Sequence, residues 1–186
     1  WVEVLRETYP QDELISEMDK DVRLLQRIAE RFSKTGSLPE PKPENLNDVV
    51  SNVVQYIRRR TSNKVSIGVA MPEHPLIVMT SAPLFEWVVE NLCKNAIDAM
   101  DGQGRITLTA RDEQDCFSVE VADTGKGIAS KNFRNVFMPG FTTKSRGWGL
   151  GLSLAKRIVE EYHHGRIFVK SSETGRGTTF RIELRK

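Results

Sequence analysis

Apolar residues recur at helical spacing in four stretches of the chain. In residues 49–57, 81–100 and 150–162 they fall on one side of a helix with a period of 3.6 residues, which predicts three amphipathic helices. Ser81 followed by Pro83 is a typical start signal for the second of these. The fourth stretch lies before these, near the N-terminus. It has a heptad-like seam of apolar residues: Ile15, Met18, Val22, Leu25, Ile28 and Phe32.

Shorter stretches alternate apolar and polar residues or form brief apolar runs, and these predict strands. They are residues 65–69, 76–79, 106–110, 117–121, 166–170 and 179–184. Residues 76–79 read as a buried strand. Strands interleaved with helices predict an α/β fold, with one mixed sheet covered by helices on one face.

The chain divides at a short proline-rich stretch. Gly36 ends the first helical stretch, and Pro39, Pro41 and Pro43 predict a stiff linker. We therefore expect a helical segment over 1–36, a linker over 37–45 and a domain over 46–186. Because Pro10 interrupts the helical pattern near the start, residues 1–36 predict either part of a helical hairpin that dimerises or one amphipathic helix packed on its own domain.

Composition excludes several classes of function. The net charge of +2, with basic and acidic residues interspersed, gives no basic face for nucleic acid. No apolar stretch reaches the roughly 20 residues that cross a bilayer, so we expect no membrane contact by this chain. Cys93 and Cys116 lack CxxC spacing, which favours reduced thiols and a cytoplasmic location.

The helix over 81–100 carries polar residues beside its apolar stripe. Asn91, Asn95 and Asp98 lie four and three residues apart, so they share one face. Amide oxygens are hard ligands that suit Mg²⁺, which completes its shell with water and phosphate oxygens. Taken alone, these residues fit equally well with surface positions of no function.

A glycine-containing turn follows a predicted strand. Asp123 at the strand end can accept a hydrogen bond from an exocyclic amine such as that of adenine. Gly125 and Gly127, which precede Ile128, let the backbone approach a ligand closely. The alternative is an ordinary loop.

The segment from Phe137 to Arg146 predicts a lid. Thr142 and Thr143 are small and polar, and Lys144 or Arg146 can meet a terminal phosphate. Solvated loop charges are the alternative for both basic residues.

A second glycine-rich segment opens the last helix. Gly147, Gly149 and Gly151, with Leu150 and Leu152 between and after them, expose backbone N–H groups at a helix start, where the helix dipole favours an anion. This pattern predicts phosphate binding, or else a structural hinge.

In this order and spacing the four motifs resemble the N, G1, F and G2 boxes of sensor histidine kinases. These kinases belong to a wider ATPase superfamily with gyrase, a heat-shock chaperone and mismatch-repair ATPases. The resemblance covers about residues 44–186 and includes the ending at 175–180, Gly-Arg-Gly-Thr-Thr-Phe.

The resemblance implies a Bergerat-type two-layer α/β sandwich that binds ATP and Mg²⁺. Asn95 would ligate the metal, assisted by Asn91, and both would act in phosphoryl transfer together with Lys144. Asp123 would read the adenine amine, supported by Thr178 partly through water. The glycines would shape the pocket and the lid.

The helical segment resembles the second half of a dimerisation and phosphotransfer domain, whose acceptor histidine would precede Trp1. It implies a homodimer through residues 1–36 and a response-regulator receiver domain as partner in bacterial two-component signalling. The parent protein would be cytoplasmic or anchored in the inner membrane. His74, His163 and His164 do not fit the acceptor role, and we expect the last two to favour the cationic form at a helix end.

Superfamily members that hydrolyse ATP have a glutamate where this chain has Asn91. An amide cannot take a proton from water, and neighbouring Glu90 points about 100° away along the helix and is expected to form an exposed pair with Lys94. These features favour a histidine kinase over an ATP-hydrolysing machine. A non-catalytic dimeric nucleotide sensor is the third hypothesis.

Overall fold

The computed structural model describes residues 41–142 and 149–186. Helices form at the three predicted places, and two short helical turns form in the loop that follows the Gly125–Gly127 turn. They are α3 (Leu46–Arg58), α4 (Ala82–Ala99), η1 (Ser130–Asn132), η2 (Asn135–Phe137), α5 (Gly151–Arg157) and η3 (Ile158–Tyr162). The seam over 1–36 and the proposed dimer contact lie outside the described residues.

The strands form two sheets. They are β1 (Lys42–Asn45), β2 (Val65–Ala70), β3 (Ile77–Thr80), β4 (Gly104–Asp112), β5 (Cys116–Asp123), β6 (Arg166–Glu173) and β7 (Gly177–Arg185). The larger sheet has the order β2-β4-β5-β7-β6, in which only β2 and β4 are parallel. The predicted mixed sheet is therefore confirmed.

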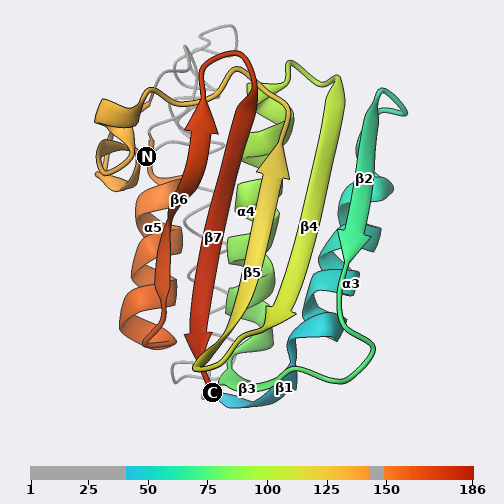
Figure 1. Cartoon of the computed structure of the whole chain (residues 1–186). Coiled ribbons are helices and arrows are strands. Elements are labelled where there is room, and N and C mark those ends of the chain that lie inside the picture. Colours follow the sequence, from blue (N-terminus) through green and yellow to red (C-terminus); the bar gives the residue numbers. More distant parts are fainter. Residues whose placement is uncertain (1–40, 143–148) are drawn as a thin grey trace, which may run out of the picture.

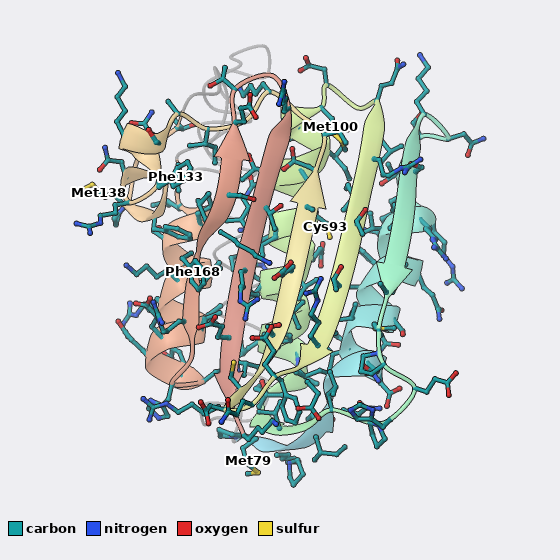
Figure 2. All side chains as sticks on the ribbon, in the orientation of Figure 1. Met79, Cys93, Met100, Phe133, Met138 and Phe168 are labelled. Carbon is teal, nitrogen blue, oxygen red and sulfur yellow. The ribbon has the colours of Figure 1, made fainter. Side chains whose placement is uncertain are left out.

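The helices α3, α4 and α5 cover one face of the large sheet, which gives two layers (Figure 1). The core lies between them, where Phe85 and Leu92 of α4 meet sheet residues such as Leu108 and Ile182, all fully buried. Both cysteines are free, and Cys93 lies on α4 behind the sheet (Figure 2). Burial raises the pKa of the Cys93 thiol to about 12, which keeps it protonated. Among the described residues no helix combines the length and apolar character needed to cross a membrane.

A two-stranded ribbon of β1 and β3 lies beside α3. Nothing in the sequence pattern indicated β1, which falls within the predicted linker 37–45. Residues 76–79 are not a buried strand as predicted, because their burial alternates: Leu76 and Val78 are buried, whereas Ile77 and Met79 are half exposed. The ribbon has only one covered face, so alternate side chains point to solvent.

The outer face of the large sheet carries a charged network. The Arg181 guanidinium on β7 contacts Glu113, Glu120 and Glu183 at 2.5, 2.8 and 2.9 Å, and Lys170 contacts Glu120 at 2.6 Å. Hydrogen bonding from Arg181 lowers the pKa of Glu113 below its usual value. One largely buried guanidinium is thus shared by three carboxylates, on a face that no helix of the described residues covers.

The last helix and its end differ from the prediction. The helix over 150–162 is α-helical only to Arg157 and continues as the π-helical turn η3. His163, expected to favour the cationic form, is instead buried, and its Nε2 accepts a hydrogen bond from the Ser81 backbone N–H at 3.1 Å. Burial lowers the pKa of His163 to about 4, with His164 adding to the effect, so the ring is neutral at pH 7.

Arg181→Ala should destabilise the domain by roughly 2–4 kcal/mol, because it leaves three carboxylates without their shared cation. Arg166 is the matched control: its side chain is 75% exposed and lies 3.6 Å from Glu183, so Arg166→Ala should change stability by less than about 1 kcal/mol. Urea denaturation of both variants measures the difference, and equal stabilities would contradict the role given to Arg181.

His163 should make the domain acid-sensitive. Its pKa is lower in the folded state than in the unfolded state, so stability is complete above the unfolded value near 6.5 and falls as pH drops towards 4, by up to about 3 kcal/mol. His163→Gln keeps an acceptor but does not titrate, and should flatten this part of the stability profile. His164→Gln, at the exposed neighbouring position, removes only the smaller of the two contributions and should leave most of the slope. If His163→Gln retained the full wild-type slope between pH 6.5 and 4, the buried ring would not be its source.

Candidate functional site

The C-terminal half of α4 carries the predicted amide residues to one end of the molecule. Met100 directly after α4 lies at the upper end of the sheet, whereas Met79 lies at the lower end (Figure 2). Asn91 and Asn95 are partly buried and Asp98 is exposed, as expected for a polar border beside the buried stripe. The Asn91 side-chain amide nitrogen is buried and has no hydrogen-bond partner within residues 41–142 and 149–186.

Glu90 points away from the amide residues. Its Oε1 lies 2.6 Å from the Lys94 Nζ, so the predicted pair is confirmed. The pair is less exposed than expected, because only 13% of the Glu90 side chain is accessible to solvent. With its charge held by Lys94, Glu90 is not directed at the position that Asn91 occupies.

Asp123 ends β5 as a buried carboxylate. Its Oδ1 accepts a hydrogen bond from the Gly125 N–H at 2.7 Å, and the Thr178 N–H on β7 also donates to the carboxylate. Burial raises the pKa of Asp123 above its usual value, while these two N–H donors oppose the rise. The remaining lone pairs make Asp123 a hydrogen-bond acceptor for a ligand.

The loop after β5 packs directly on the end of α4. A Cβ atom at Gly125 would lie 2.6 Å from the Ala99 carbonyl oxygen, so only glycine fits there without a backbone shift. The next residue fixes the contact, because the Lys126 N–H donates to the Ala99 oxygen at 2.9 Å. Asp123 is thereby held beside the helix that carries Asn95.

The second glycine of this loop, Gly127, packs on the end of β6. Gly127 has φ +72°, and a Cβ there would lie 2.1 Å from the Glu173 carbonyl oxygen at the end of β6. The following Ile128 N–H donates to Ser172 Oγ at 2.7 Å, and Ser172 Oγ lies 2.9 Å from Thr178 Oγ1. The buried Thr178 is therefore part of the same cluster, and its support of base recognition stays a prediction.

The start of α5 lies against the amide residues. A Cβ at Gly151 would lie 2.5 Å from Asn91 Oδ1, so the absence of a side chain lets α5 begin beside Asn91. Gly149 has φ +65° and packs against the Phe141 carbonyl oxygen. Leu150 is exposed, and Leu152 is partly buried against the core.

The structure describes only part of the predicted lid. Phe137 is buried and meets Phe180 edge to face, with ring centroids 6.1 Å apart, so it anchors η2 on the sheet. Thr142 is exposed. Thr143, Lys144, Arg146 and Gly147 lie outside the described residues, and their contacts with phosphate stay predictions.

One residue of this site was not predicted from the sequence, and one surface hollow lies away from the site. Ser172 was not among the predicted site residues, although two adjacent serines before the Gly-Arg-Gly-Thr turn were a usable signal. A shallow hollow lined by residues such as Met71, His74 and Arg111 lies at the other ends of β2 and β4, where His74 pairs with Asp112 at 3.2 Å. It contains none of the predicted site residues.

The donor set fits an adenine nucleotide with Mg²⁺. Asp123 provides an acceptor for the base amine, and the amide side chains of α4 provide neutral oxygens for a hard cation. The buried Asn91 amide nitrogen has no partner among the described residues, which suits a ligand, because an amide turned either way offers a donor or an acceptor at that position. Gly151 lets the start of α5 approach Asn91 without a side chain between them.

Residues 80–186 match the family described as histidine kinase-, DNA gyrase B-, and HSP90-like ATPase, which is more than half of the chain. Sensor histidine kinase ZraS of Escherichia coli (strain K12) is 44% identical over 141 residues, covering 75% of this chain and 30% of that protein. Sporulation kinase D of Bacillus subtilis (strain 168) is 28% identical over 192 residues, covering 99% of this chain and 37% of that protein. The chain thus spans about a third of the length of these curated relatives.

Solved structures agree with this result. The catalytic domain of histidine kinase ThkA is 30% identical, with a TM-score of 0.68, and the match covers 79% of this chain and 96% of that one. ThkA in complex with response regulator protein TrrA shares the fold, with a TM-score of 0.72 at 24% identity over 98% of this chain and 55% of that one. The chain belongs to the histidine kinase-, DNA gyrase B- and HSP90-like ATPase family, and within it this is an ATP-binding catalytic domain similar to those of sensor histidine kinases.

Proposed function

We propose that this chain binds ATP with Mg²⁺ and transfers the γ-phosphoryl group to a histidine on a dimerisation domain formed in part by residues 1–36. The observation that best supports this proposal is that the Asn91 side-chain amide lies against Gly151 at the start of α5. The superfamily members that hydrolyse ATP have a glutamate at the position of Asn91. The neighbouring Glu90 forms an ion pair with Lys94. With no carboxylate to activate water at this position, transfer to a side chain is favoured over hydrolysis.

The chain's own residues would act by position and charge. Asp123 would fix the adenine end, and Asn95 and Asn91 would hold the metal at the phosphate end. When bound, Mg²⁺ supplies neutralisation of the phosphate charge. Positioning of the terminal phosphate for in-line attack by an imidazole then accounts for most of the rate, with Lys144 as the proposed basic contact.

We further propose a homodimer and a response-regulator receiver domain as partners. The structural relative ThkA has been solved with response regulator protein TrrA, which supports the second of these. ZraS and sporulation kinase D are longer than this chain, so the stimulus-sensing part of such a protein would lie outside it.

Asn95→Ala should reduce the affinity for ATP in the presence of Mg²⁺ by at least about tenfold, because a metal ligand is lost. The unfolding temperature should change little, since Asn95 lies at the border of the buried stripe. Isothermal titration calorimetry with and without Mg²⁺ measures the effect. Asn52→Ala, at an exposed position of α3, is the matched amide control, and unaltered ATP affinity in Asn95→Ala would count against the metal site.

The full-length parent protein should incorporate label from γ-labelled ATP in an acid-labile, alkali-stable form, as expected of phosphohistidine. Asn91→Glu introduces the carboxylate of the hydrolysing relatives and should raise phosphate release relative to labelling. Asn91→Gln keeps an amide and serves as the control for side-chain length. Rapid steady phosphate release by the wild-type protein, without acid-labile label, would instead identify a hydrolase.

A further inference from the structure

Thr124, the residue after Asp123, joins three segments of the chain. Its backbone N–H donates to the Arg105 carbonyl oxygen at 3.2 Å, and its Oγ1 accepts from the Arg105 N–H at 3.1 Å. These reciprocal hydrogen bonds continue the pairing of β4 with β5 one residue beyond the pair of Ile106 and Asp123. The Thr124 hydroxyl thus takes the place of a strand carbonyl oxygen on β4.

The hydroxyl proton of Thr124 is directed at the end of α4. A backbone N–H can only donate, so Oγ1 uses a lone pair on Arg105 and keeps its own proton. That proton has an acceptor in the Met100 Sδ atom, 3.4 Å away and directly after α4. A Cβ at Gly104 would lie 2.6 Å from Sδ and 2.7 Å from Oγ1, so the two atoms fill the space that a side chain there would need.

This pair of side chains is a second link between the loop after β5 and the end of α4. The first link is the backbone contact of Gly125 with Ala99. Met100 follows Ala99 directly, and Thr124 lies between Asp123 and Gly125. Met100 is buried, so the sulfur end of the link is closed off from solvent.

We propose that Thr124 is a positioning residue that, through Met100, sets the end of β5 at a fixed place relative to α4. The inference rests on the proposed ATP-binding function, in which Asp123 would hold the base and the amides of α4 would hold the metal at the phosphates. A ligand that engages both ends gains from their fixed register, because its second contact is then intramolecular. A ligand that engages only the base end gains nothing from that register.

The test compares ATP with Mg²⁺, which spans both ends, and adenosine, which has the base but no phosphate. Thr124→Val keeps the side-chain shape but has no hydroxyl. It should weaken the binding of ATP with Mg²⁺ by roughly threefold to tenfold, while adenosine affinity stays nearly unchanged. Thr124→Ser retains the hydroxyl and should restore the wild-type ratio of the two dissociation constants. Calorimetry measures the first constant and NMR titration the second.

The sulfur atom provides an independent arm of the test. Met100→Leu removes the acceptor and should change the ratio in the same direction as Thr124→Val. Because the two side chains share one hydrogen bond, the double variant should lose less than the sum of the single losses. Strictly additive losses would show that the two residues act separately and would contradict the proposal.

Two matched substitutions elsewhere serve as controls. Thr109→Val makes the same change at a partly exposed position of β4, and Met79→Leu makes the other at the end of the molecule opposite Met100 (Figure 2). Both should leave the two affinities unchanged. A shift of the ratio in either control as large as that in Thr124→Val would overturn the role given to Thr124.

A merely structural role would give a different result. Loosening of the loop, or partial unfolding, would weaken ATP and adenosine alike and leave their ratio unaltered. That outcome in Thr124→Val would refute the inference while the proposed function stands, whereas failure of the wild-type chain to bind ATP would overturn the proposed function itself. If Thr124→Val does not fold, Met100→Leu decides, and an unchanged ratio in it refutes the link.

Discussion

The site depends on the contact between Gly125 and the last turn of α4. The backbone of the loop after β5 lies so close to Ala99 that no side chain fits between them, and the Lys126 N–H hydrogen bond holds it there. This contact joins the end of a sheet strand to the end of a core helix. Because Asp123 lies two residues before Gly125 and Asn95 one turn before Ala99, the contact brings the end of β5 that carries Asp123 to the end of α4 that carries Asn95.

A second layer of close backbone contacts extends the same arrangement. Gly127 packs on the end of β6, and Gly177, with φ +111°, approaches the Asp123 carbonyl oxygen so closely that a Cβ would lie 1.9 Å from it. Gly151 packs on Asn91. Glycines in this domain therefore act less as flexible hinges than as places where two backbone segments, or a backbone and an amide, touch. The absence of a side chain at these glycines is what allows the contacts.

Much of this could be predicted from the sequence, because periodicity reports which faces are buried. The amphipathic stripe of α4 and the alternation in β4 indicated the two layers, and the spacing of Asn91 and Asn95 placed both on one border. Two kinds of feature escaped. The ribbon of β1 and β3 is short and contains Pro43, so its pattern is too weak to indicate pairing. His163 and Ser172 take their roles from partners 82 and 44 residues away, and no local pattern reports such partners.

The buried histidine illustrates how long-range contacts reverse a local expectation. A histidine at a helix end favours the cation when solvent surrounds it, because the helix dipole is unopposed by desolvation. His163 is instead packed edge to face against Phe85 and accepts the Ser81 N–H at the start of α4, so desolvation outweighs the dipole and the ring stays neutral. The start of α4 is thereby held by a neutral acceptor on the last helix, and its far end is held by Gly125. A helix held at both ends in this way fixes the place of Asn91 and Asn95 between them, which suits the proposed role of these amides in positioning a ligand.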